Sequence, residues 1–185
     1  MSNSPADSAP TDILPAPELP ATELPATVHG HPLSDSFGQA VVHVPCSGYL
    51  ALIKALIAEG YVMLVDLCGV DYLIHPGRAL PEGFDAERFE IVLNLLDIEH
   101  RRRLRVRVQV PELDPVIPSL FDLHPGSEAM EREAYDMFGI SFSDHPDLTR
   151  ILMPEDWEGY PLRKDYGIGE IPVQFSAQYS QGTTP

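Results

Sequence analysis

Cysteine is scarce in this sequence, and its scarcity excludes two ways of building a protein. Cys46 and Cys68 are the two cysteines among 185 residues. A small domain stabilised by disulfides needs more of them, and an iron–sulfur cluster or an all-cysteine zinc site needs four thiolates. We therefore expect both cysteines to be small, buried, reduced side chains.

Basic residues and long apolar runs are also few. The chain has 12 Lys and Arg against 28 Asp and Glu, a formal net charge of −16. So negative a chain does not attract nucleic acid or an anionic lipid surface through its overall field. The longest uncharged stretch, 36–53, contains Gln39, His43 and Pro45 and falls short of the roughly 20 apolar residues of a membrane span. With no secretion signal visible, we expect a cytoplasmic protein that reaches a membrane only through another protein.

Signatures of catalysis are absent from the sequence. It contains no phosphate-binding loop, no dinucleotide-binding glycine pattern, no H-E-x-x-H and no G-x-S-x-G. The strongest cluster is Glu131, Glu133 and Asp136, which could form an acid–base pair or a metal site with oxygen ligands. Surface charge on a helix is the simpler interpretation and contact with a partner protein the next, because Glu131 and Glu133 do not face each other on a helix.

The two ends of the chain differ in composition. Residues 1–32 contain seven prolines and no Lys or Arg, which favours a disordered, polyproline-like acidic tail. Residues 141–185 are aperiodic but carry apolar side chains, Ile151, Leu152 and Trp157 among them. Such content predicts an extended C-terminal arm that lies on its own domain or on a neighbouring protein.

Residues 33–140 predict a single α+β domain. Apolar alternation between turn signals indicates four strands, at 41–44, 61–67, 89–96 and 103–110. Apolar residues at helical spacing indicate helices at 49–59, 119–123 and 128–138. Ser47 and Ser127 are the expected N-caps and Gly139 the expected end of the last helix. We therefore expect a mixed or antiparallel sheet of about four strands, with helices packed on one face.

One strand of this sheet has a very basic side. Arg103, Arg105 and Arg107 alternate with the apolar residues of 103–110. No aromatic residue stands among them, as a nucleic-acid platform would need. We expect this face to be solvated or paired with acidic side chains, although some of the arginines could meet an acidic surface of a partner.

The segment that follows the domain resembles a known family. The resemblance rests on the stretches 131–140, 145–148, 150–152, 156–159 and 161–166. They are similar to the 30 kDa subunit of proton-translocating NADH–quinone oxidoreductase, which is respiratory complex I or NDH-1. A looser similarity at Asp71-Tyr72, Arg88-Phe89-Glu90 and 102–106 extends the resemblance over residues 33–168.

The resemblance implies a role without chemistry of its own. Members of this family are structural subunits of the peripheral arm, which supports electron transfer from NADH through FMN and iron–sulfur clusters to quinone, coupled to proton translocation. FMN and the clusters are then expected in neighbouring subunits, and this chain is expected to hold no catalytic, cofactor or metal residue. Its expected place is peripheral, on the cytoplasmic side of the inner membrane, with the C-terminal arm running over the 49 kDa subunit beside the iron–sulfur subunits.

The residues expected to face a partner or to brace the arm come from the matching stretches. They are Glu131, Arg132, Glu133, Asp136, Phe138, His145, Pro146, Asp147, Arg150, Trp157, Pro161, Arg163, Lys164 and Asp165. Two alternatives remain open at this point. One is the equivalent subunit of a membrane-bound hydrogenase or of a quinone reductase with another donor, and the other is a free-standing acidic enzyme that uses Glu131, Glu133 and Asp136.

Overall fold

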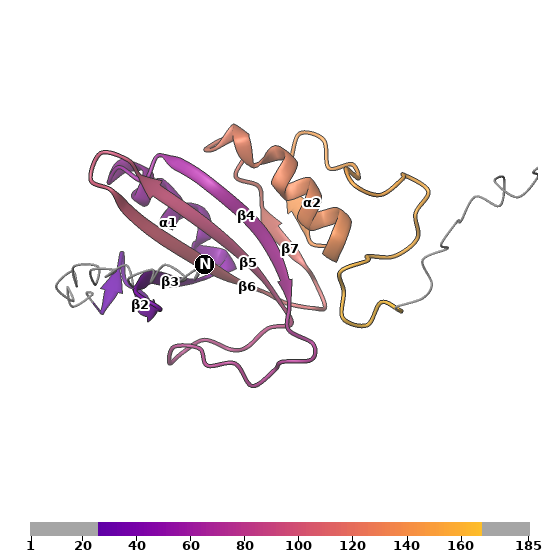
Figure 1. The fold of residues 1–185 in the computed structure, drawn as a ribbon, viewed down its shortest axis with the longest axis horizontal. Helices are drawn as coiled ribbons and strands as arrows, with labels where there is room; N and C mark the ends of the chain where they lie inside the picture. Colours follow the sequence, from indigo (N-terminus) through magenta and orange to yellow (C-terminus); the bar gives the residue numbers. More distant parts are fainter. Residues whose placement is uncertain (1–25, 168–185) are drawn as a thin grey trace, which may run out of the picture.

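A six-stranded mixed sheet forms the centre of the protein (Figure 1) in the computed structural model, which describes residues 26–167. The strand order across the sheet is β1-β2-β3-β6-β5-β4. All neighbouring strands are antiparallel except β3 and β6, which are parallel. The strands are β1 (Thr27–Val28), β2 (His31–Ser36), β3 (Gln39–Pro45), β4 (Met63–Asp71), β5 (Phe89–Asp97) and β6 (Arg102–Val110).

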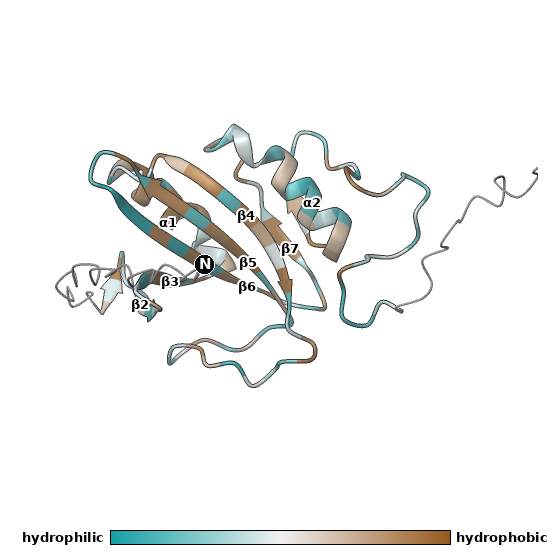
Figure 2. Cartoon of the chain, in the orientation of Figure 1, coloured by the Kyte–Doolittle hydropathy of each residue, from teal (hydrophilic) through white to brown (hydrophobic). Residues whose placement is uncertain are grey.

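The β5–β6 hairpin supplies the middle of the core and confirms the predicted pairing. Its register places Leu93 opposite Val106 and Ile91 opposite Val108, and all four side chains are buried. The same period of two that predicted the strands gives them one apolar face (Figure 2). The basic residues of β6 lie on the opposite face.

Both α-helices pack against the apolar face of the sheet, as expected. Helix α1 (Tyr49–Ala58) follows the short 3-10 helix η1 (Cys46–Gly48), and helix α2 (Glu128–Phe138) follows η2 (Pro125–Ser127). Leu52 and Ile53 of α1 and Phe138 of α2 join one core with the strands. Gly69 of β4 makes room for α2, because a Cβ at this position would lie 2.7 Å from the Phe138 ring.

The chain leaves the domain through a second, small sheet. Strands β7 (Val116–Pro118) and β8 (Ser141–Ser143) pair in parallel on either side of α2 in the sequence. The arm that follows, residues 144–167, has no helix or strand and continues past α2 (Figure 1). No helix in the described part of the chain is long and apolar enough to cross a membrane.

The sheet has more strands than predicted, because no pattern in the sequence marks its first edge. Strands β1 and β2 lie in residues 27–36, so residues 26–32 are not the disordered tail that was expected. Strand β2 reads His-Pro-Leu-Ser-Asp-Ser, which lacks apolar alternation, and a Pro is compatible with an edge strand. The rest of the predicted tail, residues 1–25, and the end of the predicted arm, 168–185, lie outside the described residues.

Three local predictions are wrong. Residues 119–123 form a turn rather than a helix, because the carboxylate of Glu131 binds both the Ser119 hydroxyl and the Leu120 amide. Ser47 is part of η1, and Gly48 precedes α1 in its place. Cys68 is exposed rather than buried.

Candidate functional site

The carboxylate of Asp136 holds the start of the arm against α2. The Asp136 residue is fully buried. Its Oδ1 accepts a hydrogen bond of 2.6 Å from Arg150 Nη1. Its Oδ2 accepts three more, from the consecutive backbone amides of Ile151, Leu152 and Met153, at 3.0, 2.8 and 2.8 Å. One side chain thereby fixes four donors of the arm, and we call this contact the first anchor.

A second side chain of α2 reinforces the first anchor. Arg132 donates to the carbonyl oxygens of Thr149 and Arg150 at 3.1 and 2.9 Å and to the Thr149 hydroxyl at 3.0 Å. Arg132 is also 3.7 Å from Glu128, one turn earlier on the helix. The ion pair of Glu128 and Arg132 thus lies along α2, whereas Asp136, one turn further on, is turned inward to the arm.

The arm then closes the C-terminal end of α2. The last carbonyls of a helix lack partners within it. Here Met137 O accepts from the Leu162 amide at 3.1 Å, and Phe138 O accepts from Arg163 Nε at 2.7 Å. The Arg163 guanidinium also lies 5.0 Å from the centre of the Phe89 ring and 4.8 Å from that of Tyr160. Such distances allow cation–π attraction to both rings.

Gly139 is required by this closure. Its φ is +73°, the left-handed conformation that ends a helix. A Cβ at position 139 would lie 2.6 Å from the Tyr160 ring of the arm. The glycine therefore serves both the turn of the chain and the close approach of the arm, which a sequence can suggest only for the turn.

The end of the described arm is fixed at the sheet by a second anchor. Asp71, at the end of β4, accepts from Arg88 at 3.1 and 3.0 Å and from the Lys164 amide at 2.8 Å. Arg88 in turn donates to Asp165 of the arm at 2.7 Å and to Glu112 at 2.5 Å. Three segments of the chain, β4, the β6–β7 connection and the arm, thus meet at one nearly buried guanidinium.

Both anchoring aspartates are held in the charged form. Burial by itself would raise the pKa of Asp136, but the three arm amides and Arg150 hold it below its ordinary value. Burial likewise opposes ionisation of Asp71, and Arg88 together with the Lys164 and Leu73 amides lowers its pKa. The charge of each aspartate is therefore stabilised by the arm contacts that it makes.

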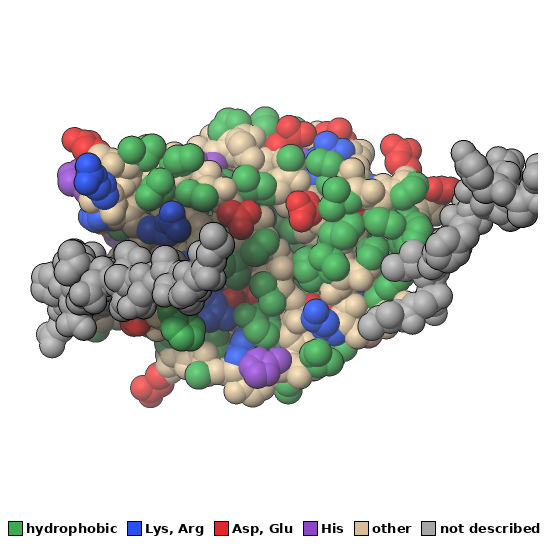
Figure 3. Space-filling model, viewed as in Figure 1, with side chains coloured by type: hydrophobic (Ala, Val, Ile, Leu, Met, Phe, Trp, Pro, Cys, Tyr) green, Lys and Arg blue, Asp and Glu red, His purple; other side chains and the backbone are tan. Residues whose placement is uncertain are grey.

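The anchored arm directs several apolar side chains outward. Ile151, Leu152 and Leu162 are 40%, 61% and 49% exposed, although the backbone of each is hydrogen-bonded to α2. In the view of Figure 3, hydrophobic side chains gather on the right, where Figure 1 places α2 and the arm. A rigid backbone with outward apolar side chains is an arrangement suited to contact with another protein.

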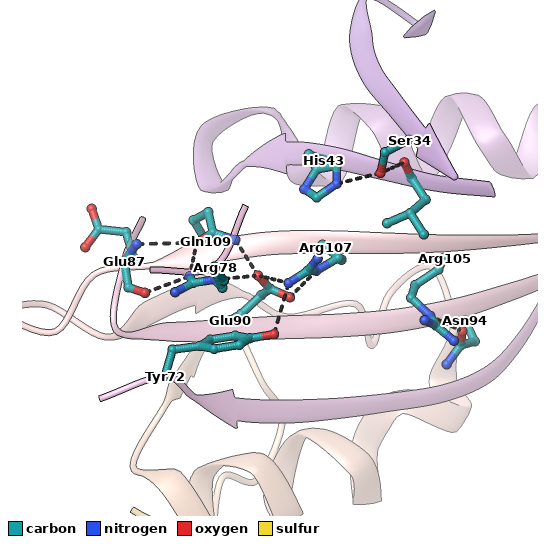
Figure 4. Close-up of polar contacts among 11 residues, drawn as sticks. Ser34, His43, Tyr72, Arg78, Glu87, Glu90, Asn94, Arg105, Arg107 and Gln109 are labelled. Carbon is teal, nitrogen blue, oxygen red and sulfur yellow. Dashed lines mark hydrogen bonds and ion pairs between the residues drawn. The ribbon is translucent and has the colours of Figure 1, made fainter. Parts of the chain in front are cut away.

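The basic face of the sheet is paired internally, as predicted (Figure 4). The fully buried Glu90 of β5 accepts from Arg107 at 2.5 and 3.0 Å and from Gln109 at 2.5 Å. Arg107 also donates to the Tyr72 hydroxyl, and Arg78 lies 3.7 Å from the centre of the Tyr72 ring. These contacts fasten the loop of residues 72–88 over part of the basic face.

The predicted carboxylate cluster does not exist as a site. Glu131 is fully buried and engaged by Ser119 and Leu120, Asp136 faces the arm, and Glu133 is exposed. The surface-charge interpretation is therefore wrong for Glu131 and Asp136. Residues 26–167 contain no group of three or more His, Cys, Asp and Glu side chains placed to hold a metal.

The other predicted site residues divide by exposure. Pro146, Asp147, Lys164 and Asp165 are exposed, and Phe138 is buried. Arg132, His145, Arg150, Trp157, Pro161 and Arg163 are intermediate. The His145 ring is buried and its Nε2 lies 3.2 Å from Glu128 O, while its Nδ1 accepts from the Asp147 amide at 3.1 Å. Arg132, Asp136, Arg150, Arg163, Lys164 and Asp165 brace the arm, and their contact with a partner stays a prediction.

Four residues that shape the site were not assigned a role from the sequence. Asp71, Arg88 and Phe89 belong to the looser stretches of the resemblance, but nothing in their spacing connects them to residues 160–165. Tyr160 lies in an aperiodic segment. The contacts are distant along the chain, for example 93 positions from Asp71 to Lys164, so no local pattern could have paired them.

Comparison with known proteins gives one consistent family. Residues 42–171 match the family described as the respiratory-chain NADH dehydrogenase 30 Kd subunit. A relative from Roseiflexus castenholzii, the NADH-quinone oxidoreductase subunit named C, is 51% identical over 116 residues, which are 63% of this chain and 61% of that protein. Subunit 5 of the Thermus thermophilus enzyme is 41% identical over 152 residues, 79% of this chain and 70% of that protein.

A solved structure supports the same relationship. The structure titled "Nqo5 of the trypsin-resistant fragment (1-134)" has a TM-score of 0.57 and 36% identity, and the match covers 64% of this chain and 90% of that one. The chain spans about half to three fifths of the length of the first curated relatives that it matches.

Proposed function

Because the chain belongs to the family of the 30 kDa subunit of respiratory-chain NADH dehydrogenase, we propose that it is a structural subunit of the peripheral arm of NADH–quinone oxidoreductase. In this role the chain binds neighbouring subunits and carries no step of the reaction. The neighbours hold FMN and the iron–sulfur clusters, and they pass electrons from NADH to quinone with translocation of protons.

The anchored arm is the observation that supports this proposal. Residues 150–165 are attached to the domain at Asp136 and at the Asp71–Arg88 pair, and apolar side chains among them point outward. A segment already fixed in its bound shape loses less conformational entropy when a partner covers it. The domain therefore serves as a frame that presents the arm, and the proposed occupant of this surface is the 49 kDa subunit.

The chemistry of the buried groups agrees with a structural role. The buried carboxylates of Asp71, Glu90, Glu131 and Asp136 each accept hydrogen bonds from other residues of the chain. A general acid or base must reach a substrate proton, and these groups are occupied by internal donors. We place the chain on the cytoplasmic side of the inner membrane, attached through the complex.

A tagged full-length chain, expressed in place of the native copy, tests the proposal. Purification from detergent-solubilised membranes should recover the flavin and iron–sulfur subunits with NADH:quinone reductase activity. Recovery of the chain without these subunits, or turnover by the chain alone, would overturn the proposal. Recovery with a complex that oxidises a donor other than NADH would overturn the assignment of the enzyme.

The Arg163→Ala variant tests the arm more directly. It removes the Phe138 O contact and the stacking between two rings, so we expect less assembled complex with the same turnover per complex. Lys54→Ala is the matched control, since Lys54 is an exposed basic residue of α1 on the domain. Normal amounts of complex with reduced turnover would contradict the structural role.

A further inference from the structure

The turn between β2 and β3 carries an aromatic side chain where the backbone does not favour one. Ser36 and Gln39 are paired, so Phe37 and Gly38 form a two-residue hairpin loop. Their φ angles are +54° and +78°. Two consecutive positive φ values are the mark of a type I′ turn, in which Asn-Gly and Asp-Gly are the preferred pairs. A bulky residue such as Phe in the first position is strained.

Phe37 gains nothing from its own domain in return for this strain. Its side chain is fully exposed, at 104% of the reference area. The other described non-glycine residues with positive φ are His29, Arg101 and Asp144, all of them polar. Phe37 is therefore the one among these that combines a strained backbone with complete exposure of an apolar side chain, and such a combination points to a role outside the fold.

The turn lies far from the arm. Figure 1 shows β2 and β3 at the side of the sheet opposite to α2 and the arm. The parallel pairing of Ala40 with Leu104 brings the turn beside the start of β6. Arg103 is exposed there and forms no ion pair with another described residue. Asp35, the nearest acidic residue of the hairpin, accepts from the Gly38 amide through one oxygen.

We propose that Phe37 is an anchor that inserts into an apolar pocket on a neighbouring subunit of the complex, a pocket whose rim carries carboxylates facing Arg103. This inference rests on the proposed function, because it takes the neighbour from the same assembly. Aromatic side chains that fill a pocket at the centre of a contact dominate binding energy. The charge of the rim follows from complementarity to Arg103. The chain would then be held at two opposite sides, by the arm and by the turn.

The Phe37→Asn variant separates binding from folding, since the two should change in opposite directions. Asn is the preferred residue at this turn position, so the purified variant should be at least as stable as the wild type, with an unfolding constant up to about fivefold smaller. Incorporation should fall. Tagged variant and untagged wild type are co-expressed, the complex is isolated through another subunit, and mass spectrometry gives the ratio of the two chains.

We expect the share of Phe37→Asn in the complex, relative to its share in the extract, to fall by at least about tenfold. Phe37→Leu keeps an apolar side chain at the same position and should stay within about threefold of the wild type. Equal incorporation of Phe37→Asn, or a loss with Leu as large as with Asn, would overturn the inference. Failure of the proposed function looks different, because the wild-type chain itself would then be missing from the complex.

Discussion

Replacing Asp136 with alanine removes the first anchor and should free the arm while leaving the domain folded. In the wild type this buried carboxylate binds Arg150 and three consecutive amides. If these donors stayed buried, loss of the ionic partner would cost about 3–5 kcal/mol, and each amide without a partner about 1–3 kcal/mol more. The arm can avoid most of this by moving into water, so detachment of the arm is the less costly outcome.

Hydrogen exchange of the full-length chain measures this detachment. We expect the amides of Ile151, Leu152 and Met153 to exchange about 100-fold faster in Asp136→Ala, which corresponds to about 3 kcal/mol of lost protection. The amide of Val106, in the central strand β6, should be unchanged. Trypsin should also cleave after Arg150, whose side chain is 14% exposed in the intact structure.

Glu133→Ala is the matched control, because it removes an exposed carboxylate from the same helix. It should leave both exchange and cleavage as they are in the wild type. Unchanged protection of residues 151–153 in Asp136→Ala would refute the anchoring role of this carboxylate. Equal loss of protection in the arm and in β6 would show that the two unfold as one unit, which would refute the separation of frame and arm.

Three further changes test the packing around the site. Gly139→Ala should lower thermal stability by at least about 2 kcal/mol, because a Cβ meets the arm and φ is positive; Gly126→Ala, with open space around it, should stay within about 0.5 kcal/mol, and equal effects would contradict the clash. In denaturant unfolding, Arg107→Met should cost about 3–5 kcal/mol because Glu90 stays buried without its ionic partner; Glu90→Leu added to it should restore more than half, and a further loss would count against the argument. Burial, aided by Arg107, lowers the pKa of His43 from 6.5 to about 4; the unfolded chain binds the proton first, so stability should fall by up to about 3 kcal/mol as pH drops from 6.5 to 4, and unfolding of His43→Gln should show a flatter pH dependence, an identical one being the refuting result.

The elements that the sequence predicts well are those whose pattern is local. Alternation over 89–96 and 103–110 predicted the β5–β6 hairpin, and helical spacing predicted α1, because the period of the apolar residues is set by the backbone geometry of each element. The end of α2 at Gly139 follows from the left-handed conformation that glycine adopts easily. The aperiodic but apolar composition of 141–167 indicated an arm in contact with other residues, and the motif stretches within it indicated the family.

The partner of each charged residue was decided by the tertiary structure. Glu131, Glu133 and Asp136 are equally acidic neighbours on one helix, yet one stabilises a turn, one meets solvent and one fixes the arm. Asp71 and Lys164 meet across 93 positions. The sequence determines that such groups exist and on which side of an element they lie. Only the folded chain determines which donor reaches which carboxylate, because hydrogen bonds depend on distances of about 3 Å between residues that are far apart in the sequence.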